Sequence, residues 1–229
     1  MTKQLVSRKH HRRYDSRRLQ ILRTASAAFS RKGFSGVTME EIGDDLEVTK
    51  GSLYYYFRSK QDLLYFCQKY SLRRLLEEAE RMTRSSQPVT MQLYELIVSQ
   101  IRCMLDELQG SVAHAEFRAL PEAQLQEIIQ KRDRYEAILR DLVKKGMEEE
   151  IFHPGNPRIL VWAILGAINW TVQWYTPTGP LSAQEIGQEF ALFLVRGLTR
   201  AEHLGSLPSQ TQFDQAYSLE SVSQPEYLE

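Results

Sequence analysis

The chain of 229 residues is 42% hydrophobic and 25% charged, so it is long and apolar enough to bury a sizeable core. This composition excludes an intrinsically disordered chain and a small fold that depends on disulfides. Cys67 and Cys103 lie in segments of helical pattern without metal-like spacing, which predicts two buried small side chains in a reducing cytoplasm. A redox-sensing pair is the alternative.

The net charge is zero, but the charges are divided unevenly along the chain. Residues 1–60 contain 13 lysines and arginines against 6 acidic residues, whereas residues 61–229 contain 16 against 23. A basic N-terminal module on an acidic body indicates a part that binds a polyanion. The charge alone is equally compatible with a solvated basic face.

Apolar residues recur at helical spacing almost throughout, which predicts an all-α fold. The longest apolar stretch, residues 159–168, is too short to cross a bilayer, so we expect no membrane partner. The expected helices span residues 14–32, 39–46, 50–57, 60–84, 91–108, 125–147, 158–175 and 182–201, with a short helix or turn at 114–120. Gly33 is well placed to cap the first of these helices.

Composition and pattern divide the chain into four parts. We expect a basic flexible arm at 1–13, a small cationic helical domain at 14–60, a larger helical domain at 61–204 and a polar mobile tail at 205–229. The arm either contacts DNA or is disordered. Its adjacent histidines have no further ligand at suitable spacing, so no metal site is expected.

Residues 38–57 have the pattern of two short helices joined by a tight turn. Thr38 and Glu41 form a capping box for the first helix, and Thr49 is placed to cap the second. Ile42 and Leu46 lie one turn apart on the buried face of the first helix. Such a pair is typical of a helix-turn-helix, whose second helix enters the major groove of double-stranded DNA by its N-terminus.

The residues that open the second helix carry groups suited to DNA. Lys50 can donate to guanine, the hydroxyls of Thr49 and Ser52 can contact bases or phosphates, and Gly51 lets the backbone approach closely. Tyr54, Tyr55 and Lys60 are placed to reach backbone phosphates. Aromatic residues at helical spacing are most often core, but with Leu53 and Phe57 on the buried side at least one of Tyr54 and Tyr55 must point outward.

Residues 38–64, which end in the run LYYYFRSKQDLL, resemble the signature of the tetracycline-repressor (TetR) family. The resemblance implies a three-helix helix-turn-helix domain followed by a helical domain for ligand binding and dimerisation. It also implies base or phosphate contacts for Thr49, Lys50, Gly51, Ser52 and Tyr54, and phosphate contacts for Thr38, Tyr55 and Lys60. Glu47 departs from the pattern, because the family commonly has glycine there, and we expect a strain of about 1 kcal/mol in the turn.

A pseudo-palindromic operator would require a dimer with twofold symmetry. Small and apolar residues on the last two expected helices are candidates for its interface: Ala163, Gly166, Gly187, Phe190 and Leu194. The resemblance implies a four-helix interface between two subunits. The same residues are equally suited to an internal core.

Candidates for an effector pocket fall into two groups. Met104, Phe117 and Tyr135 could line a space between helices, although such residues are most often core. Arg158 precedes the aromatic series Trp162, Trp170 and Trp174, and its guanidinium suits a phosphate or carboxylate. Residues 167–179 resemble family members that control fatty-acid or steroid catabolism, which implies an acyl-CoA effector; another hydrophobic or aromatic ligand is the alternative.

The sequence therefore predicts a dimeric, ligand-responsive repressor of transcription that is released from its operator by a hydrophobic effector. A helical enzyme is the first alternative, but the sequence has no nucleophile and base motif, phosphate loop or metal cluster. No cofactor is expected. A structural protein that binds DNA without sequence preference is the second alternative, and its binding would depend on salt alone.

Overall fold

The computed structural model describes residues 2–107 and 117–208, with side chains from residue 14 onward apart from that of residue 107. Over these ranges the fold is all-α, as predicted, and the only β pairing is an isolated bridge between Phe152 and Thr199. The helices are α1 (Thr2–Lys32), α2 (Met39–Asp45), α3 (Lys50–Tyr56), α4 (Lys60–Thr83), α5 (Val89–Arg102), α6 (Glu122–Glu148), α7 (Pro157–Trp174) and α8 (Ala183–Leu198).

The first helix is the main departure from the expected boundaries. It begins at Thr2 rather than near residue 14, so the segment predicted as a flexible arm forms the first turns of α1. Residues 2–13 contain neither glycine nor proline, and nothing in them ends a helix. The helix ends as predicted, because Gly33 follows it with a φ of 70°.

Two other expected segments lie partly outside the described residues. Of the short element expected at 114–120, the structure describes a single 3₁₀ turn, Phe117–Ala119. The expected mobile tail begins within the described part, where Ala201–Ser206 forms a 3₁₀ helix, and its residues 209–229 lie beyond it.

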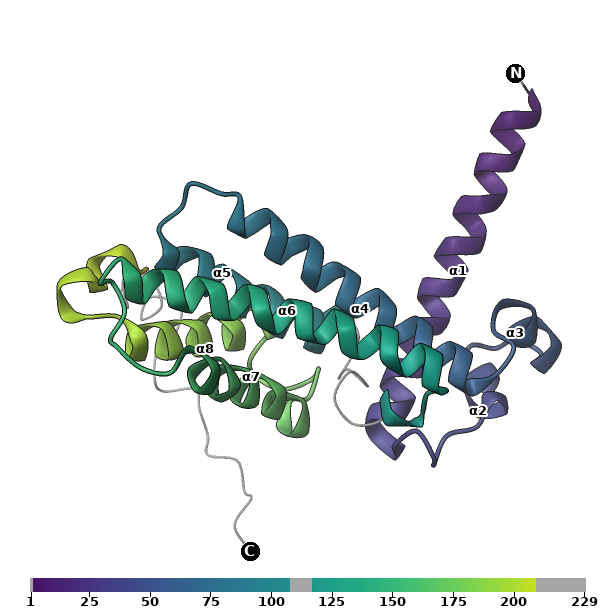
Figure 1. The fold of residues 1–229 in the computed structure, drawn as a ribbon. Coiled ribbons are helices and arrows are strands. Elements are labelled where there is room, and N and C mark those ends of the chain that lie inside the picture. Colours follow the sequence, from purple (N-terminus) through teal and green to yellow (C-terminus); the bar gives the residue numbers. More distant parts are fainter. Residues whose placement is uncertain (1, 108–116, 209–229) are drawn as a thin grey trace, which may run out of the picture.

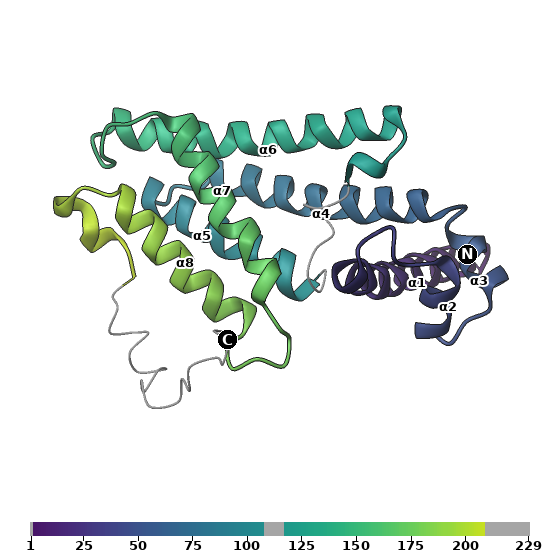
Figure 2. The ribbon, with the colours of Figure 1, turned by 90° about the horizontal axis from the view of Figure 1, so that it is seen from below.

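The helices α1, α2 and α3 gather at one end of the molecule, and α4 leads from them into the body (Figure 1). In the body α5 packs against α8 and α4 against α6, while α7 lies across the same core, as Figure 2 shows from below. None of the described helices is long and apolar enough to cross a membrane. Both cysteines are buried as predicted, and burial raises the pKa of the Cys67 thiol to about 12, which disfavours the reactive thiolate.

The contact between α5 and α8 depends on Gly187, a candidate for either the dimer interface or the internal core. A Cβ atom on Gly187 would lie 3.3 Å from both the Cα and the carbonyl oxygen of Val98. Gly187 is buried and faces α5 within the same subunit, so its assignment to a dimer interface is wrong. A residue without a side chain is needed here because the two backbones approach closely.

The end of α6 is joined to the end of α8 around Phe152. The backbone N–H of His153 donates to Leu198 (2.7 Å) and that of Arg200 donates to Ile151 (2.9 Å). The Phe152 ring is fully buried and packs directly on Gly146 in the last turns of α6. Any side chain at Gly146 would overlap that ring.

Gly146→Ala should therefore lower the free energy of unfolding by about 1–3 kcal/mol, although the same change at an open helical position would stabilise the protein. Denaturation in urea measures this value. The neighbouring Lys145→Ala is the control, since Lys145 is exposed and should change stability by less than about 0.5 kcal/mol. A stabilised Gly146→Ala variant would show that Phe152 can move away without loss.

Candidate nucleic-acid interface

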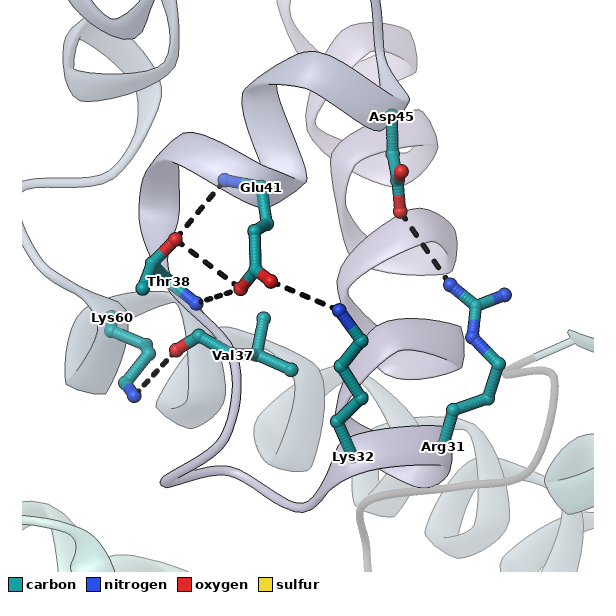
Figure 3. Close-up of polar contacts among 7 residues, drawn as sticks. All are labelled: Arg31, Lys32, Val37, Thr38, Glu41, Asp45 and Lys60. Carbon is teal, nitrogen blue, oxygen red and sulfur yellow. Dashed lines mark hydrogen bonds and ion pairs between the residues drawn. The ribbon is translucent and has the colours of Figure 1, made fainter.

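The capping box predicted for the first helix of the pair is present at the start of α2. The Thr38 hydroxyl accepts a hydrogen bond from the backbone N–H of Glu41 (3.1 Å), and the Glu41 carboxylate accepts one from the backbone N–H of Thr38 (2.8 Å). Lys32 and Arg31 in the last turn of α1 pair with Glu41 (2.9 Å) and Asp45 (3.5 Å), as Figure 3 shows. These exposed pairs contribute little stability, but they orient α2 against α1.

The turn between α2 and α3 is tight and contains the strained residue expected from the sequence. The Val48 N–H donates to the Gly43 carbonyl (2.9 Å), and a Cβ atom on Gly43 would lie 3.2 Å from the Val48 carbonyl oxygen. Glu47 has a φ of 53°, in the left-handed region that favours glycine. The turn geometry predicted for the motif is therefore kept at the cost of this strain.

The N-terminus of α3 presents its polar groups to solvent. Thr49 caps the helix as predicted, accepting from the backbone N–H of Ser52 (3.2 Å). Lys50, Gly51 and Ser52 are all exposed, and no atom of the described chain would touch a Cβ on Gly51. Leu53 and Phe57 are fully buried on the opposite side, so the open end of α3 is free to meet a partner.

Lys50 is held in place by groups on either side of it. Its ammonium pairs with Glu40 of α2 and lies 5.9 Å from the centroid of the Tyr54 ring. The Glu40 carboxylate raises the pKa of Lys50 and has its own pKa lowered by the same hydrogen bond. Both side chains are exposed, so an incoming acceptor on DNA can replace Glu40 at little cost.

The consecutive tyrosines divide as the sequence argument required. Tyr54 is 39% exposed and Tyr55 67% exposed, whereas Tyr56 is half-buried. The ring of Tyr14 on α1 lies 6.0 Å from that of Tyr55 and 5.1 Å from that of Tyr56. Tyr14 was not among the predicted site residues. Its ring packs against those of Tyr55 and Tyr56 and so connects α1 to α3.

Lys60 has a second function that the sequence did not reveal. Its ammonium donates to the carbonyl of Val37 (2.7 Å), as Figure 3 shows. It also donates to the carbonyl of Phe34 (2.7 Å) and lies 4.4 Å from the centroid of the Phe34 ring. Two of its three N–H groups therefore hold the loop between α1 and α2 against the start of α4. The predicted phosphate contact of Lys60 stays a prediction, now limited to the remaining N–H.

The residues predicted for an effector pocket do not lie together. Met104 and Tyr135 are buried in the body, where the Tyr135 hydroxyl donates to the Gln100 side-chain oxygen (2.9 Å). Phe117 is half-buried, and the Arg132 guanidinium lies 4.6 Å from the centroid of the Phe117 ring. This first group lies within the body, as core residues do.

The tryptophans lie instead on the outer face of α7. Trp162, Trp170 and Trp174 are 47%, 66% and 46% exposed, and Arg158 stacks on Trp162 with its guanidinium 4.7 Å from the ring centroid. They therefore do not share one enclosed pocket with the buried Met104 and Tyr135. The reason is helical spacing, because residues three to four positions apart share one face, and the buried face of α7 is occupied by Val161, Ile164 and Ile168.

The proposed interface residues divide in a similar way. Ala163 and Gly166 lie on the exposed side of α7, whereas Phe190 and Leu194 of α8 are half-buried. The Phe190 ring lies 6.1 Å from that of Trp174, which joins the outer faces of the two helices. Phe193, 78% exposed, belongs to the same face and was not predicted, because a single phenylalanine beside buried residues has no distinctive spacing.

Two family models match the chain, one at the DNA-binding end and one in the helical body. The model described as bacterial regulatory proteins of the tetR family matches residues 21–65, and the one described as a tetracyclin repressor-like C-terminal domain matches residues 86–198. The chain belongs to the TetR family. Like other members of the TetR family it is a DNA-binding transcription regulator and not an enzyme.

Known relatives of this TetR-family chain match along most of their length. It is 26% identical over 199 residues to the HTH-type transcriptional repressor KstR2 of Mycobacterium tuberculosis. The alignment covers 81% of this chain and 94% of KstR2. The solved structure of that ketosteroid regulator has a TM-score of 0.73 at 24% identity and covers 80% of this chain and 95% of its own.

Two further solved structures share the fold of this chain. The TetR-family regulator PfmR from Thermus thermophilus has a TM-score of 0.69 at 25% identity and covers 79% of this chain and 99% of its own. AibR, solved with isovaleryl coenzyme A and operator DNA, has a TM-score of 0.62 at 22% identity and covers 78% of this chain and 98% of its own.

Because Glu47 has a positive φ, Glu47→Gly should raise the free energy of unfolding by about 1 kcal/mol. Glu47→Ala is the matched control, since alanine removes the carboxylate but keeps the unfavourable backbone conformation. Chemical denaturation of both variants beside the wild type measures the difference. An equal gain in the two variants would show that the charge of Glu47, and not its φ, is the source of the strain.

Proposed function

We propose that this regulator is a repressor that binds a pseudo-palindromic operator as a homodimer and is released by a coenzyme A thioester. The observation that carries the DNA-binding part is the open N-terminus of α3, where Lys50, Gly51 and Ser52 are exposed while Leu53 anchors the helix. A helix presented by its N-terminus is the form in which a helix-turn-helix enters the major groove.

The dimer is supported by the exposed apolar face of α7 and α8. Large side chains on it are roughly half exposed or more, namely Ile159, Trp162, Trp170, Trp174 and Phe193. Contiguous apolar surface of this kind marks an interaction site, and a twofold axis through it would bury each patch against its copy. The exposed small residues Ala163 and Gly166 would let the two copies of α7 approach closely.

The effector is inferred from the charge beside this face. Arg158 begins α7 with its guanidinium over Trp162, so a cation and an aromatic surface are presented together to an incoming anion. A thioester of coenzyme A has phosphates that can pair with the Arg158 guanidinium and an apolar acyl group that can contact the surrounding side chains. A neighbour of the same fold, AibR, has been solved with isovaleryl coenzyme A and operator DNA.

Release from DNA follows from linkage between the two sites. In a dimer, the spacing of the two α3 helices decides whether both can enter the operator. An effector that binds more tightly to a form with unsuitable spacing weakens operator binding by the difference between its affinities for the two forms, and by no more. The helix α4 runs from the DNA-binding end into the body, so a displacement of the body reaches α3 through it (Figure 1).

Lys50→Ala should weaken operator binding and reduce discrimination between bases, each by about 1–3 kcal/mol, because a base contact is lost. Tyr55→Phe should weaken binding almost equally for all sequences, since a phosphate contact carries no sequence information. Titrations of the selected operator and of a scrambled duplex at matched salt measure both effects. Residues 49–52 at the N-terminus of α3 form the reading edge of this assignment, and unchanged operator affinity for Lys50→Ala would defeat it. Failure to select any half-site palindrome would favour binding without sequence preference.

A long-chain acyl-CoA should raise the melting temperature more than free coenzyme A does, because it also buries its apolar chain. Native mass spectrometry of the purified protein identifies any ligand that is carried over. Arg158→Met should reduce the response to acyl-CoA, whereas Lys144→Met, on the exposed side of α6, should not. A protein that responds to no acyl-CoA would leave another hydrophobic ligand as the effector.

A further inference from the structure

A cleft of about 540 Å³ lies between α1 and the first half of α4, away from both the reading edge and the exposed face of α7. The axes of α1 and α4 diverge from each other (Figure 1). Its volume is in the range of small-molecule sites. One wall belongs to the DNA-binding end and the other to the helix that enters the body, so a ligand in the cleft would touch both.

Arg18 is the residue of α1 that gives the cleft its chemistry. Its guanidinium lies over three rings, 4.0 Å from the centroid of Phe66, 4.9 Å from that of Phe57 and 5.8 Å from that of Tyr14. Its Nε is buried without a hydrogen-bond partner, and among the described residues no carboxylate forms an ion pair with it. A buried N–H without a hydrogen-bond partner is costly, and a guanidinium without a carboxylate partner leaves donors for an anionic ligand.

The other charges of the cleft are largely balanced. Lys69 pairs with Glu127 of α6 (3.0 Å), and Arg73 lies 3.7 Å from Glu77. Asp15 and Asp62 also line the cleft, and Asp62 accepts from the backbone N–H of Arg58 (3.2 Å). Three cations and two carboxylates leave a lining that suits one anionic group on a small molecule and not a polyanion such as DNA.

Flat aromatic surfaces lie beside these cations on α4. The Lys69 ammonium is 5.2 Å from the centroid of Tyr65, and the Arg73 guanidinium is 5.5 Å from that of Tyr70. Phe66 and Tyr70 are neighbours, with ring centroids 6.4 Å apart. Aromatic side chains of this kind stack on nucleobases whatever the base, while an arginine fork binds phosphate.

We propose that the cleft between α1 and α4 binds a nucleotide, with Arg18 as the phosphate anchor and Tyr65 and Tyr70 as the surface for its base. The nucleotide is a free one, since the proposed function places the phosphates of a coenzyme A thioester at Arg158 on α7. Arg18 also covers Phe57, the C-cap residue of α3, so an occupied cleft alters the support of α3. This regulatory consequence rests on the proposed operator binding, whereas binding of the nucleotide does not.

Isothermal titration of the full chain with AMP, adenosine and inorganic phosphate tests the site. AMP should bind more tightly than either of its parts, and Arg18→Met should weaken AMP binding by about tenfold or more, because a charged hydrogen bond is lost. Arg17→Met is the matched control, since Arg17 is the adjacent arginine of α1 but does not line the cleft. Phosphate that binds as tightly as AMP would overturn the proposal.

A second variant guards against misfolding of Arg18→Met. Tyr70→Leu changes the opposite wall, and it should also weaken AMP binding while thermal unfolding stays cooperative. Wild-type affinity for AMP in both variants would overturn the proposal. Coenzyme A should not displace AMP, because its proposed site is at Arg158 on α7, and displacement would overturn the assignment of the cleft to a free nucleotide. Absent operator binding would defeat the proposed function but would leave the calorimetric result standing.

Discussion

The reading helix α3 has seven residues, too few for a helix to be stable in water by itself. Its existence therefore depends on the burial of Leu53 and Phe57 against the neighbouring helices. The same burial fixes which side of α3 is exposed, and with it the direction in which Lys50 and Ser52 point. Because this support is tertiary, any displacement of α1 or α4 also changes the presentation of the reading edge.

Three sets of contacts hold that support together. The Thr38 capping box with Lys32 orients α2 on α1, and Lys60 ties the loop between them to the start of α4. Arg18 joins α1 to the end of α3 and to α4 through stacked rings. Of these contacts, only those of Lys60, the first residue of α4, and of Arg18 involve α4. A displacement of α4 therefore reaches the DNA-binding end through these two residues.

The exposed aromatic face of α7 explains why ligand and dimer residues were difficult to separate from the sequence. Tryptophans with a polar edge suit a ligand pocket and a subunit interface equally well. The structure places them on the outside, next to exposed Ala163 and Gly166, and leaves Met104 and Tyr135 in the interior. An effector that contacts Arg158 and Trp162 would therefore act at the edge of the surface proposed to join two subunits.

Local chemistry by itself determined the all-α fold and the caps at Thr38 and Thr49, because these depend on residues a few positions apart. The strained φ of Glu47 was expected from the resemblance to the TetR family, which commonly has glycine there. Helical spacing also required that at least one of Tyr54 and Tyr55 be exposed, and the structure shows that both are. Only the tertiary structure decided that Gly187 faces Val98, that Lys60 binds the carbonyls of Phe34 and Val37, and that Arg18 stacks on Phe66. Each of these contacts joins segments far apart in the chain, and no periodicity in the sequence encodes which distant helix a given face will meet.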